Sequence, residues 1–186
     1  MTPPHIFGPV ASRRLGRSLG IDLIPFKTCS FDCVYCECGA TTRLSVSREE
    51  FFPPAGIRES LDQALKENPA LDYITFAGSG EPTLSRSVRE IISFLREGYP
   101  AYRIALLTNG SLCSDPDVIE DIRGADLIIP TLSSAFQETY EAIHRPHPSL
   151  TVESHIEGLK ALRRAFSGRI WLEVFLIPGI NMDRDH

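Results

Sequence analysis

Short apolar runs alternate with helix-like segments along most of this chain. Five runs are rich in aliphatic and aromatic residues and are bounded by Gly, Pro, Asn or Asp, which predicts β-strands. These runs cover residues 20–26, 71–77, 102–108, 125–131 and 169–177. Elsewhere apolar residues recur at the three- and four-residue spacing of an α-helix. The predicted helices cover residues 57–67, 85 or 87 to 97, 114–122, 136–143 and 152–166.

Three stretches near the N-terminus predict less regular structure. Residues 6–10 indicate a short extended segment, and residues 41–47 are polar and irregular or extended. Residues 12–20 contain two glycines and three arginines, which predicts a loop. Strands that alternate with helices favour βαβ units, and therefore a parallel α/β sheet with right-handed crossovers.

Unusual sequences follow each predicted strand. In parallel α/β folds, ligands bind at the carboxyl ends of the strands, so we expect these five loops to meet at one mouth. The loops are the cysteine run at 29–36, Gly-Ser-Gly-Glu-Pro at 78–82, Thr-Asn-Gly at 108–110, Thr-Leu-Ser-Ser at 131–134 and Pro-Gly-Ile-Asn at 178–181.

The cysteine run has the spacing C-x₃-C-x₂-C and contains Cys29, Cys33 and Cys36. Three thiolates on one loop can face a single inorganic centre, and thiolates select iron–sulfur clusters or zinc. A structural zinc site takes four protein ligands. Three cysteines on a 4Fe-4S cluster leave one iron open to an added ligand, which indicates chemistry rather than electron storage alone.

Two other interpretations of the cysteine run stay open. A zinc knuckle would need Cys38 or a histidine as its fourth ligand, although four-cysteine zinc sites typically use two separated pairs. A ferredoxin-like electron carrier would need a fourth cluster cysteine, and the usual bacterial spacing is C-x₂-C-x₂-C. Cys113 stands alone on a different predicted loop, where a small loop or core residue is the simpler interpretation.

Composition narrows the class of protein. The chain has 186 residues, of which 42% are hydrophobic and 23% charged, as expected for one globular domain. No apolar run approaches the roughly 20 residues that span a bilayer, and no secretory signal is evident at the N-terminus. Five cysteines are an odd number, and four lie between Cys29 and Cys38, which favours metal binding in a reducing cytoplasm over disulfides.

The charge balance argues against bulk attraction to nucleic acid. Net charge is −5 at pH 7 and the sequence pI is about 5.5. Arg13, Arg14 and Arg17 lie close together, and they form either a local basic patch or a solvated loop face.

The cysteine run, with Tyr35 just before its third cysteine, resembles the signature loop of the radical S-adenosylmethionine (SAM) enzymes. The flanking residues 8–29 resemble a narrower branch of small Fe-S oxidoreductases related to the tRNA wyosine-base-forming enzymes. The resemblance runs from about residue 7 to residue 181. It implies that SAM binds the open iron and is cleaved reductively to methionine and a 5′-deoxyadenosyl radical.

The resemblance also implies a fold and its extent. The radical SAM core is a partial (β/α) barrel of six βα units, whereas the predicted strands here number five. We therefore expect residues 1–186 to be a single radical SAM core domain that lacks the sixth βα unit and is C-terminally incomplete. An uncovered sheet edge would follow.

Further site residues follow from the resemblance. Gly78, Gly80, Glu81 and Pro82 resemble the family's Gly-Gly-Glu-Pro motif with one inserted serine, which implies contact with the SAM ammonium; a plain strand-to-helix turn is the alternative. Three more residues complete the predicted cofactor site. They are Asn109, which could instead be a turn asparagine, Ser133 with Ser134 as its neighbouring alternative, and Gly179 in the adenine-contacting loop.

Other charged residues are weaker candidates. Glu173 lies among apolar strand residues, so it either faces the active site or pairs with an arginine. Prolines in residues 144–148 favour a rigid loop over a metal site, with Arg145 as a candidate anchor for a substrate anion. Lys27 and Arg14 are similar candidates near the cysteines.

The predicted function is that of a cytoplasmic, metal-binding radical SAM oxidoreductase that abstracts a hydrogen atom from an unidentified substrate. A flavodoxin- or ferredoxin-type electron donor is the implied partner, and a tRNA base or a peptide is the implied substrate class. No catalytic residue is assigned. A non-catalytic iron–sulfur or zinc-binding protein is the competing class, and such a protein would ignore SAM.

Overall fold

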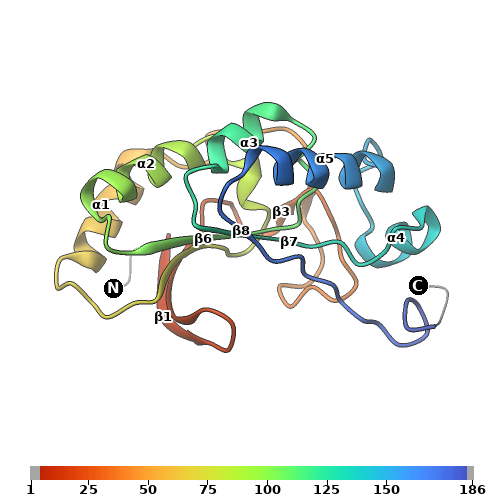
Figure 1. The fold of residues 1–186 in the computed structure, drawn as a ribbon, viewed down its shortest axis with the longest axis horizontal. Coiled ribbons are helices and arrows are strands. Elements are labelled where there is room, and N and C mark those ends of the chain that lie inside the picture. Colours follow the sequence, from red (N-terminus) through yellow and green to blue (C-terminus); the bar gives the residue numbers. More distant parts are fainter. Residues whose placement is uncertain (1–4, 184–186) are drawn as a thin grey trace.

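A six-stranded sheet with the order β1-β2-β5-β6-β7-β8 forms the centre of the molecule (Figure 1). The computed structural model describes residues 5–183, so residues 1–4 and 184–186 of the predicted domain lie outside the described part. β1 Ile6–Ser12 and β2 Gly16–Ile21 are antiparallel, and every later neighbouring pair in the sheet is parallel. The other strands of this sheet are β5 Tyr73–Phe76, β6 Arg103–Thr108, β7 Leu127–Pro130 and β8 Arg169–Ile170.

Helices connect the parallel strands, and α1, α2, α3 and α5 lie along one face of the sheet (Figure 1). Their starts follow local chemistry: the Asp115 side chain accepts a hydrogen bond from the Asp117 N–H, and Thr151 with Ser154 forms a capping box. The helices are α1 Pro54–Leu65, α2 Val88–Gly98, α3 Pro116–Ile122, α4 Gln137–His144 and α5 Val152–Ala165, with a 3₁₀ turn, η1, at Pro82–Leu84.

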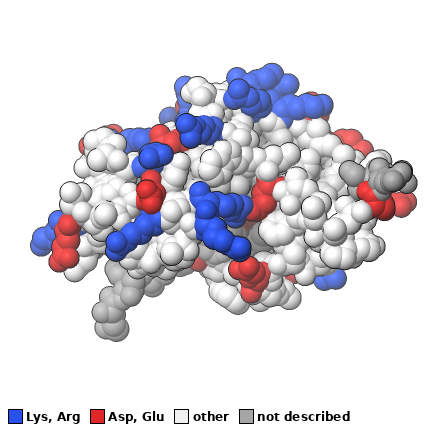
Figure 2. All heavy atoms as spheres, turned by 60° about the horizontal axis from the view of Figure 1, so that its bottom comes forward, with Lys and Arg blue, Asp and Glu red and all other residues white. Residues whose placement is uncertain are grey.

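The opposite side of the sheet is not covered by these four helices. Figure 2 brings this side forward and shows basic side chains gathered at its middle, next to acidic ones. The β1–β2 hairpin lies on this side (Figure 1) and places Leu15 in a small apolar cluster on the sheet. The other members of this cluster are Tyr73, Ala105, Leu127 and Ile129, with Leu107 packed against them.

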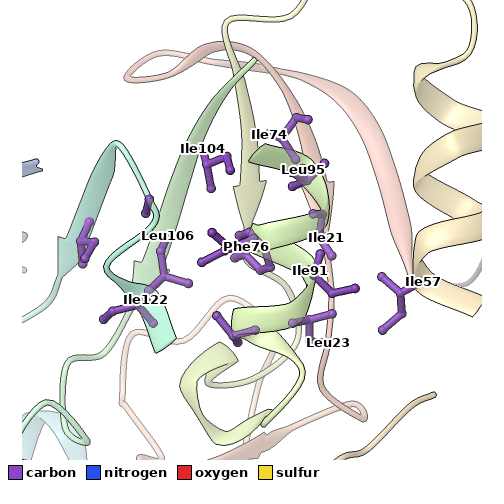
Figure 3. Close-up of a cluster of buried hydrophobic side chains, with 14 of the residues drawn as sticks. Ile21, Leu23, Ile57, Ile74, Phe76, Ile91, Leu95, Ile104, Leu106 and Ile122 are labelled. Atoms are coloured by element: carbon purple, nitrogen blue, oxygen red, sulfur yellow. The ribbon is translucent and has the colours of Figure 1, made fainter. Parts of the chain in front are cut away.

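The main core fills the space between the sheet and the helices (Figure 3). Strand side chains alternate between the two faces, so Ile104 and Leu106 point to the main core while Ala105 points away from it. On the helix side, Ile91 and Leu95 of α2 close the core. Each such side chain stabilises the fold by roughly 1.5–3 kcal/mol when fully buried.

The structure differs from the sequence-based expectation at both ends of the sheet. The predicted loop at 12–20 is wrong from Gly16 onward, because those residues pair with β1 and, through Ser18–Ile21, with β5. Only Arg169–Ile170 of the predicted strand 169–177 is a regular strand. After Ile170, the pairing continues only as an isolated parallel β-bridge between Glu173 and Thr131. Among residues 5–183, β8 is an edge strand with no neighbour on its outer side.

A separate two-stranded sheet holds the cysteine run. β3 Thr28–Cys29 pairs in parallel with β4 Arg43–Leu44. The stretch at 41–47, predicted as irregular or extended, thus contains a short strand that frames the loop carrying the cysteines. Within the part of the chain that the structure describes, no helix is long and apolar enough to cross a membrane.

Candidate metal and cofactor site

A cavity of about 230 Å³ opens at the carboxyl ends of β5, β6 and β7. All three cysteines of the C-x₃-C-x₂-C loop line it, as the sequence predicts for a shared mouth. Its lining residues are Cys29, Cys33, Tyr35, Cys36, Ala77, Gly78, Gly80, Glu81, Leu107, Thr108, Asn109, Ile129, Thr131, Glu173 and Phe175. A larger apolar groove of about 680 Å³ lies between α5 and β8 and contains none of the predicted site residues.

The cysteine loop is fixed by an apolar anchor and by backbone bonds. Phe31, 1% exposed, packs with Tyr140 and Val152 beneath the loop. The Asp32 carboxylate accepts a hydrogen bond from the Thr41 N–H at 2.7 Å, and the Asp32 N–H donates to the His144 carbonyl at 3.0 Å. The loop is therefore held before any metal binds, which reduces the entropy lost when a ligand is taken up.

Each cysteine sulfur has a side-chain nitrogen nearby. The three nitrogens come from different elements, and each approaches a different sulfur. The pairs are Asn109 Nδ2 with Cys29 Sγ at 3.5 Å, His144 Nδ1 with Cys33 Sγ at 3.5 Å, and Lys27 Nζ with Cys36 Sγ at 3.1 Å.

Burial changes the chemistry of the thiols. It raises the pKa of Cys29 to about 11, with the Glu81 carboxylate adding to the effect, and it raises the pKa of Cys33 to about 12. Both groups are therefore neutral thiols near pH 7 when no metal is bound. Metal binding must displace their protons, because the thiolate is the ligand form.

Lys27 fits an anionic group at this site. Its side chain is 2% exposed, and among residues 5–183 its ammonium forms no ion pair with a carboxylate. A buried ammonium without an anion is strongly unfavourable. A metal centre bound by three thiolates would supply that anion next to Cys36, so these residues fit a cluster.

A single metal ion fits the arrangement less well. Among residues 5–183, no three His, Cys, Asp or Glu side chains converge closely enough to hold one ion. Cys29, Cys33 and Cys36 instead line one cavity of about 230 Å³. Cys38, the possible fourth ligand of a zinc knuckle, is exposed and does not line the cavity, and Cys113 is buried in the main core.

Glu81 joins the loops after β5 and β6. Its Oε1 accepts hydrogen bonds from the Thr83 N–H and from the hydroxyls of Thr83 and Thr108, and its Oε2 accepts one from the Asn109 N–H at 2.6 Å. Burial raises the pKa of Glu81, while these hydrogen bonds oppose the rise. Oε1 is fully used, whereas Oε2 retains capacity for a further donor.

The glycines of the 78–82 segment are required by contacts within the chain. A Cβ on Gly80 would lie 2.0 Å from the Thr28 carbonyl oxygen, and one on Gly78, where φ is +152°, would lie 2.2 Å from the Asp22 carboxyl carbon. Both residues still line the cavity. Their small size thus lets the β5 loop contact the segment that leads into the cysteines.

Three predicted cofactor residues lie outside the cavity wall. Pro82 is buried and begins η1. The Ser133 hydroxyl accepts a hydrogen bond from the Phe175 N–H at 3.1 Å, and Gly179 is exposed with a φ of 76°. Asn109 does line the cavity, but its amide donates to Cys29 and Ser30. For all four of these residues, contact with SAM stays a prediction.

Glu173 satisfies both alternatives that the sequence leaves open. It lines the cavity, its Oε2 accepts a hydrogen bond from the Thr131 hydroxyl at 2.9 Å, and its Oε1 pairs with the Arg14 guanidinium. Arg14 thus reaches from the β1–β2 hairpin to the segment after β8. Arg145, by contrast, lies 3.7 Å from the Asp32 carboxylate and outside the cavity.

The sequence does not predict the contact of His144 with Cys33 or the stacking of Tyr35 on Phe175. His144 is fully buried at the end of α4, and burial lowers its pKa to about 3. The Tyr35 ring stacks on Phe175 with centroids 3.8 Å apart. Two prolines after His144 favour a loop, and the proximity of residue 144 to Cys33 depends on long-range packing that no local pattern encodes.

Comparison with known proteins agrees with this geometry. The family model described as the Radical SAM superfamily matches residues 23–186. A UPF0026 protein of Methanocaldococcus jannaschii is 39% identical over 177 residues, which are 94% of this chain and 54% of that protein. A UPF0026 protein of Synechocystis sp. is 36% identical over 177 residues, which are 95% of this chain and 66% of that protein.

A third relative is named GTPase Obg, from Brachyspira hyodysenteriae. It is 40% identical over 181 residues, which are 97% of this chain and 26% of that protein. The chain therefore spans between a quarter and two thirds of the length of these three relatives.

Solved structures share the fold at low identity. TYW1 with a lysine-pyruvate adduct bound has a TM-score of 0.63 and 19% identity, covering 90% of this chain and 58% of that one. Native anSMEcpe with bound AdoMet has a TM-score of 0.59 and 18% identity, and the match covers 83% of this chain and 42% of that one. The predicted α/β partial barrel of parallel strands is thereby confirmed.

Proposed function

Because the chain belongs to the radical SAM superfamily, we propose that it is an enzyme that cleaves SAM reductively with a 4Fe-4S cluster. Cys29, Cys33 and Cys36 are the proposed cluster ligands, within one core domain formed by residues 1–186. The product of this step abstracts a hydrogen atom from a substrate not yet identified, for which a tRNA base or a peptide is the class that we propose.

One observation carries the proposal. The three thiols line a single cavity at the carboxyl ends of parallel strands, and no other cysteine of the described residues lines it. Three protein ligands leave one iron of a 4Fe-4S cluster free for SAM. A zinc knuckle or a ferredoxin-like carrier would need a fourth protein ligand at the same place.

The chain's own residues would bind and enclose the cofactors. A bound cluster supplies the electron for SAM cleavage, and the protein positions SAM against it. Glu81 Oε2 can accept one further N–H, which suits the SAM ammonium. Tyr35 and Phe175 stack at the cavity wall and would exclude water from it.

An external electron donor completes the proposed reaction. The described residues hold one cysteine loop, and reductive cleavage consumes one electron from outside the chain for each SAM. We propose a flavodoxin- or ferredoxin-type protein as the donor.

Paired cysteine variants test the ligand set. We expect wild-type protein and Cys38→Ser, reconstituted anaerobically with iron and sulfide, to hold about four irons per chain. Cys33→Ser should lose most of this iron. With dithionite, the first two proteins should release 5′-deoxyadenosine and methionine from SAM, and Cys33→Ser should release neither.

Two results would contradict the proposal. Loss of the cluster in Cys38→Ser would make Cys38 a fourth ligand and leave no open iron. A protein that binds only zinc, or a cluster that leaves SAM intact under reducing conditions, would favour the non-catalytic alternative.

A further inference from the structure

Three side-chain nitrogens approach the three cysteine sulfurs one to one, although they come from separate parts of the fold. Lys27 precedes β3, Asn109 follows β6 and His144 ends α4. We propose that these residues form a shell of N–H donors that sets the reduction potential of the cluster. This inference rests on the proposed function, since it concerns the cluster that the cysteines are proposed to hold.

His144 is oriented as a donor by its second ring nitrogen. Nε2 lies 3.3 Å from the Ser133 N–H, which can only donate, so Nε2 accepts. A neutral imidazole then carries its proton on Nδ1. Nδ1 lies 3.5 Å from Cys33 Sγ and 3.3 Å from the Tyr35 hydroxyl, which can itself donate. The proton of His144 is therefore directed toward the sulfur and the tyrosine oxygen.

The ring of His144 cannot easily turn away. It is 0% exposed and packs against Phe31 and Tyr140, with ring centroids 5.0 and 5.2 Å away. A hydrogen-bond donor that packing holds against a metal ligand is a common means of orienting that ligand and tuning its metal.

Lys27 adds a full charge to the same shell. Its Nζ lies 3.1 Å from Cys36 Sγ, and the side chain is buried, so water screens the charge little. The left-handed backbone at Lys27, with φ of 54°, directs the side chain inward two residues before the first cysteine. The fold therefore places the ammonium beside Cys36, where it would adjoin a bound cluster.

These donors favour the reduced cluster. Reduction adds a negative charge to a centre that three thiolates already make electron-rich. N–H dipoles and a nearby cation stabilise the more negative state more strongly, so they raise the reduction potential. A higher potential would bring the cluster within reach of a biological one-electron donor. Removing a donor should lower the potential, and removing the charge should lower it further.

Redox titration of the reconstituted protein tests this inference. The midpoint potential is read from the electron paramagnetic resonance (EPR) signal of the reduced cluster in wild type, His144→Phe and Lys27→Met. We expect a more negative midpoint in both variants, with the larger shift in Lys27→Met. Lys27→Arg keeps the charge, so its midpoint potential should lie nearer to that of wild type than the midpoint of Lys27→Met does. His144→Gln keeps an N–H donor, and its midpoint should likewise lie nearer to wild type than that of His144→Phe.

His155→Phe is the matched control. His155 is a second buried histidine of the same aromatic cluster, 5.9 Å from Phe31 between ring centroids, and in the described part of the chain its ring nitrogens form no hydrogen bond with a cysteine sulfur. Its replacement should leave the midpoint potential unchanged. This control separates a general effect of disturbing the aromatic packing from loss of the donor at Cys33.

The outcomes distinguish this inference from the proposed function. Clusters of unchanged midpoint in both His144→Phe and Lys27→Met would overturn the inference and leave the proposed function standing. A wild-type protein that forms no 4Fe-4S cluster would overturn the proposed function itself. If either variant fails to retain a cluster, Asn109→Leu tests the same claim at Cys29, where an unchanged midpoint would also overturn it.

Discussion

The buried polar side chains around the cysteines form hydrogen bonds with one another. Glu81 accepts four hydrogen bonds that connect two strand ends, and Asn109 bonds both Glu81 and Cys29. A partner removed from such a network leaves a buried group unpaired, which typically destabilises a protein by about 1–3 kcal/mol. Residues near the cavity are therefore expected to tolerate few substitutions.

His155 provides a pH-dependent prediction at this scale. Burial lowers its pKa from 6.5 to about 4, so its contribution to stability is present above pH 6.5 and is lost as the pH falls toward 4. At roughly 1.4 kcal/mol per pKa unit, this one group can contribute about 3 kcal/mol to acid destabilisation.

Denaturant unfolding of the metal-free protein at pH 7.5 and pH 4.5 measures this contribution. We expect the free energy of unfolding of His155→Phe to fall by about 2–3 kcal/mol less than that of wild type between the two pH values. Equal losses in the two proteins would show that His155 does not titrate in this way.

Some residues of the site can be predicted from the sequence because their relation is local. The three cysteines lie on one loop, and their spacing alone indicates a shared centre. His144 lies 111 positions from Cys33 in the chain, and it reaches the sulfur only because α4 packs against the cysteine loop. The direction of the Lys27 side chain likewise depends on a backbone conformation that the sequence does not reveal.

At the scale of elements, the loop after β5 and the segment before the cysteines form one packed unit. The Lys27 N–H donates to the Ser79 carbonyl at 2.9 Å, and the Glu81 N–H donates to the Thr28 carbonyl at 3.2 Å. The 78–82 segment and the residues leading into the cysteine loop thus support each other through hydrogen bonds. A change in the 78–82 segment should therefore disturb metal binding by the cysteines.

Gly80→Ala tests this bracing. Its Cβ would collide with the backbone oxygen of Thr28, so we expect a loss of roughly 1–3 kcal/mol in stability, together with reduced iron uptake on reconstitution. Gly56→Ala in α1 is the control, since nothing lies within 4 Å of its added Cβ. In a helix this change should stabilise by roughly 0.5–1 kcal/mol and leave iron uptake unaltered.

A result in which the two alanine variants bind equal amounts of iron would contradict this bracing. Iron content per folded chain, with thermal unfolding of each variant alongside, distinguishes weaker metal binding from simple misfolding.

The elements that the sequence predicts well are those with their own apolar periodicity. α2 buries Val88, Ile91, Ile92 and Leu95 at helical spacing, and it forms where the pattern places it. The bounds of β2 are wrong, since the predicted strand covers residues 20–26 and β2 covers Gly16–Ile21. Its glycines and arginines indicate a loop, whereas pairing with β1 and β5 makes it a strand. The segment after Ile170 is apolar, but among the described residues it lacks the neighbouring strand that would extend it.

At the scale of the whole molecule, parallel strands bring distant loops together. Five strands of the main sheet run in parallel order from β2 to β8, so their carboxyl ends share one edge. This is why a cavity could be predicted from loops far apart in the sequence, although the predicted loop at 178–181 does not line it. Helices α1, α2, α3 and α5 cover one face of this sheet (Figure 1), while α4 ends at His144 beside the cysteine loop.

The central claim is that SAM binds the open iron of a cluster held by Cys29, Cys33 and Cys36. The most direct test is EPR spectroscopy of the anaerobically reconstituted, reduced protein with and without SAM. We predict a 4Fe-4S signal whose shape and g-values change when SAM is added. A cluster signal that is indifferent to SAM, or a protein that takes up only zinc, would contradict the account.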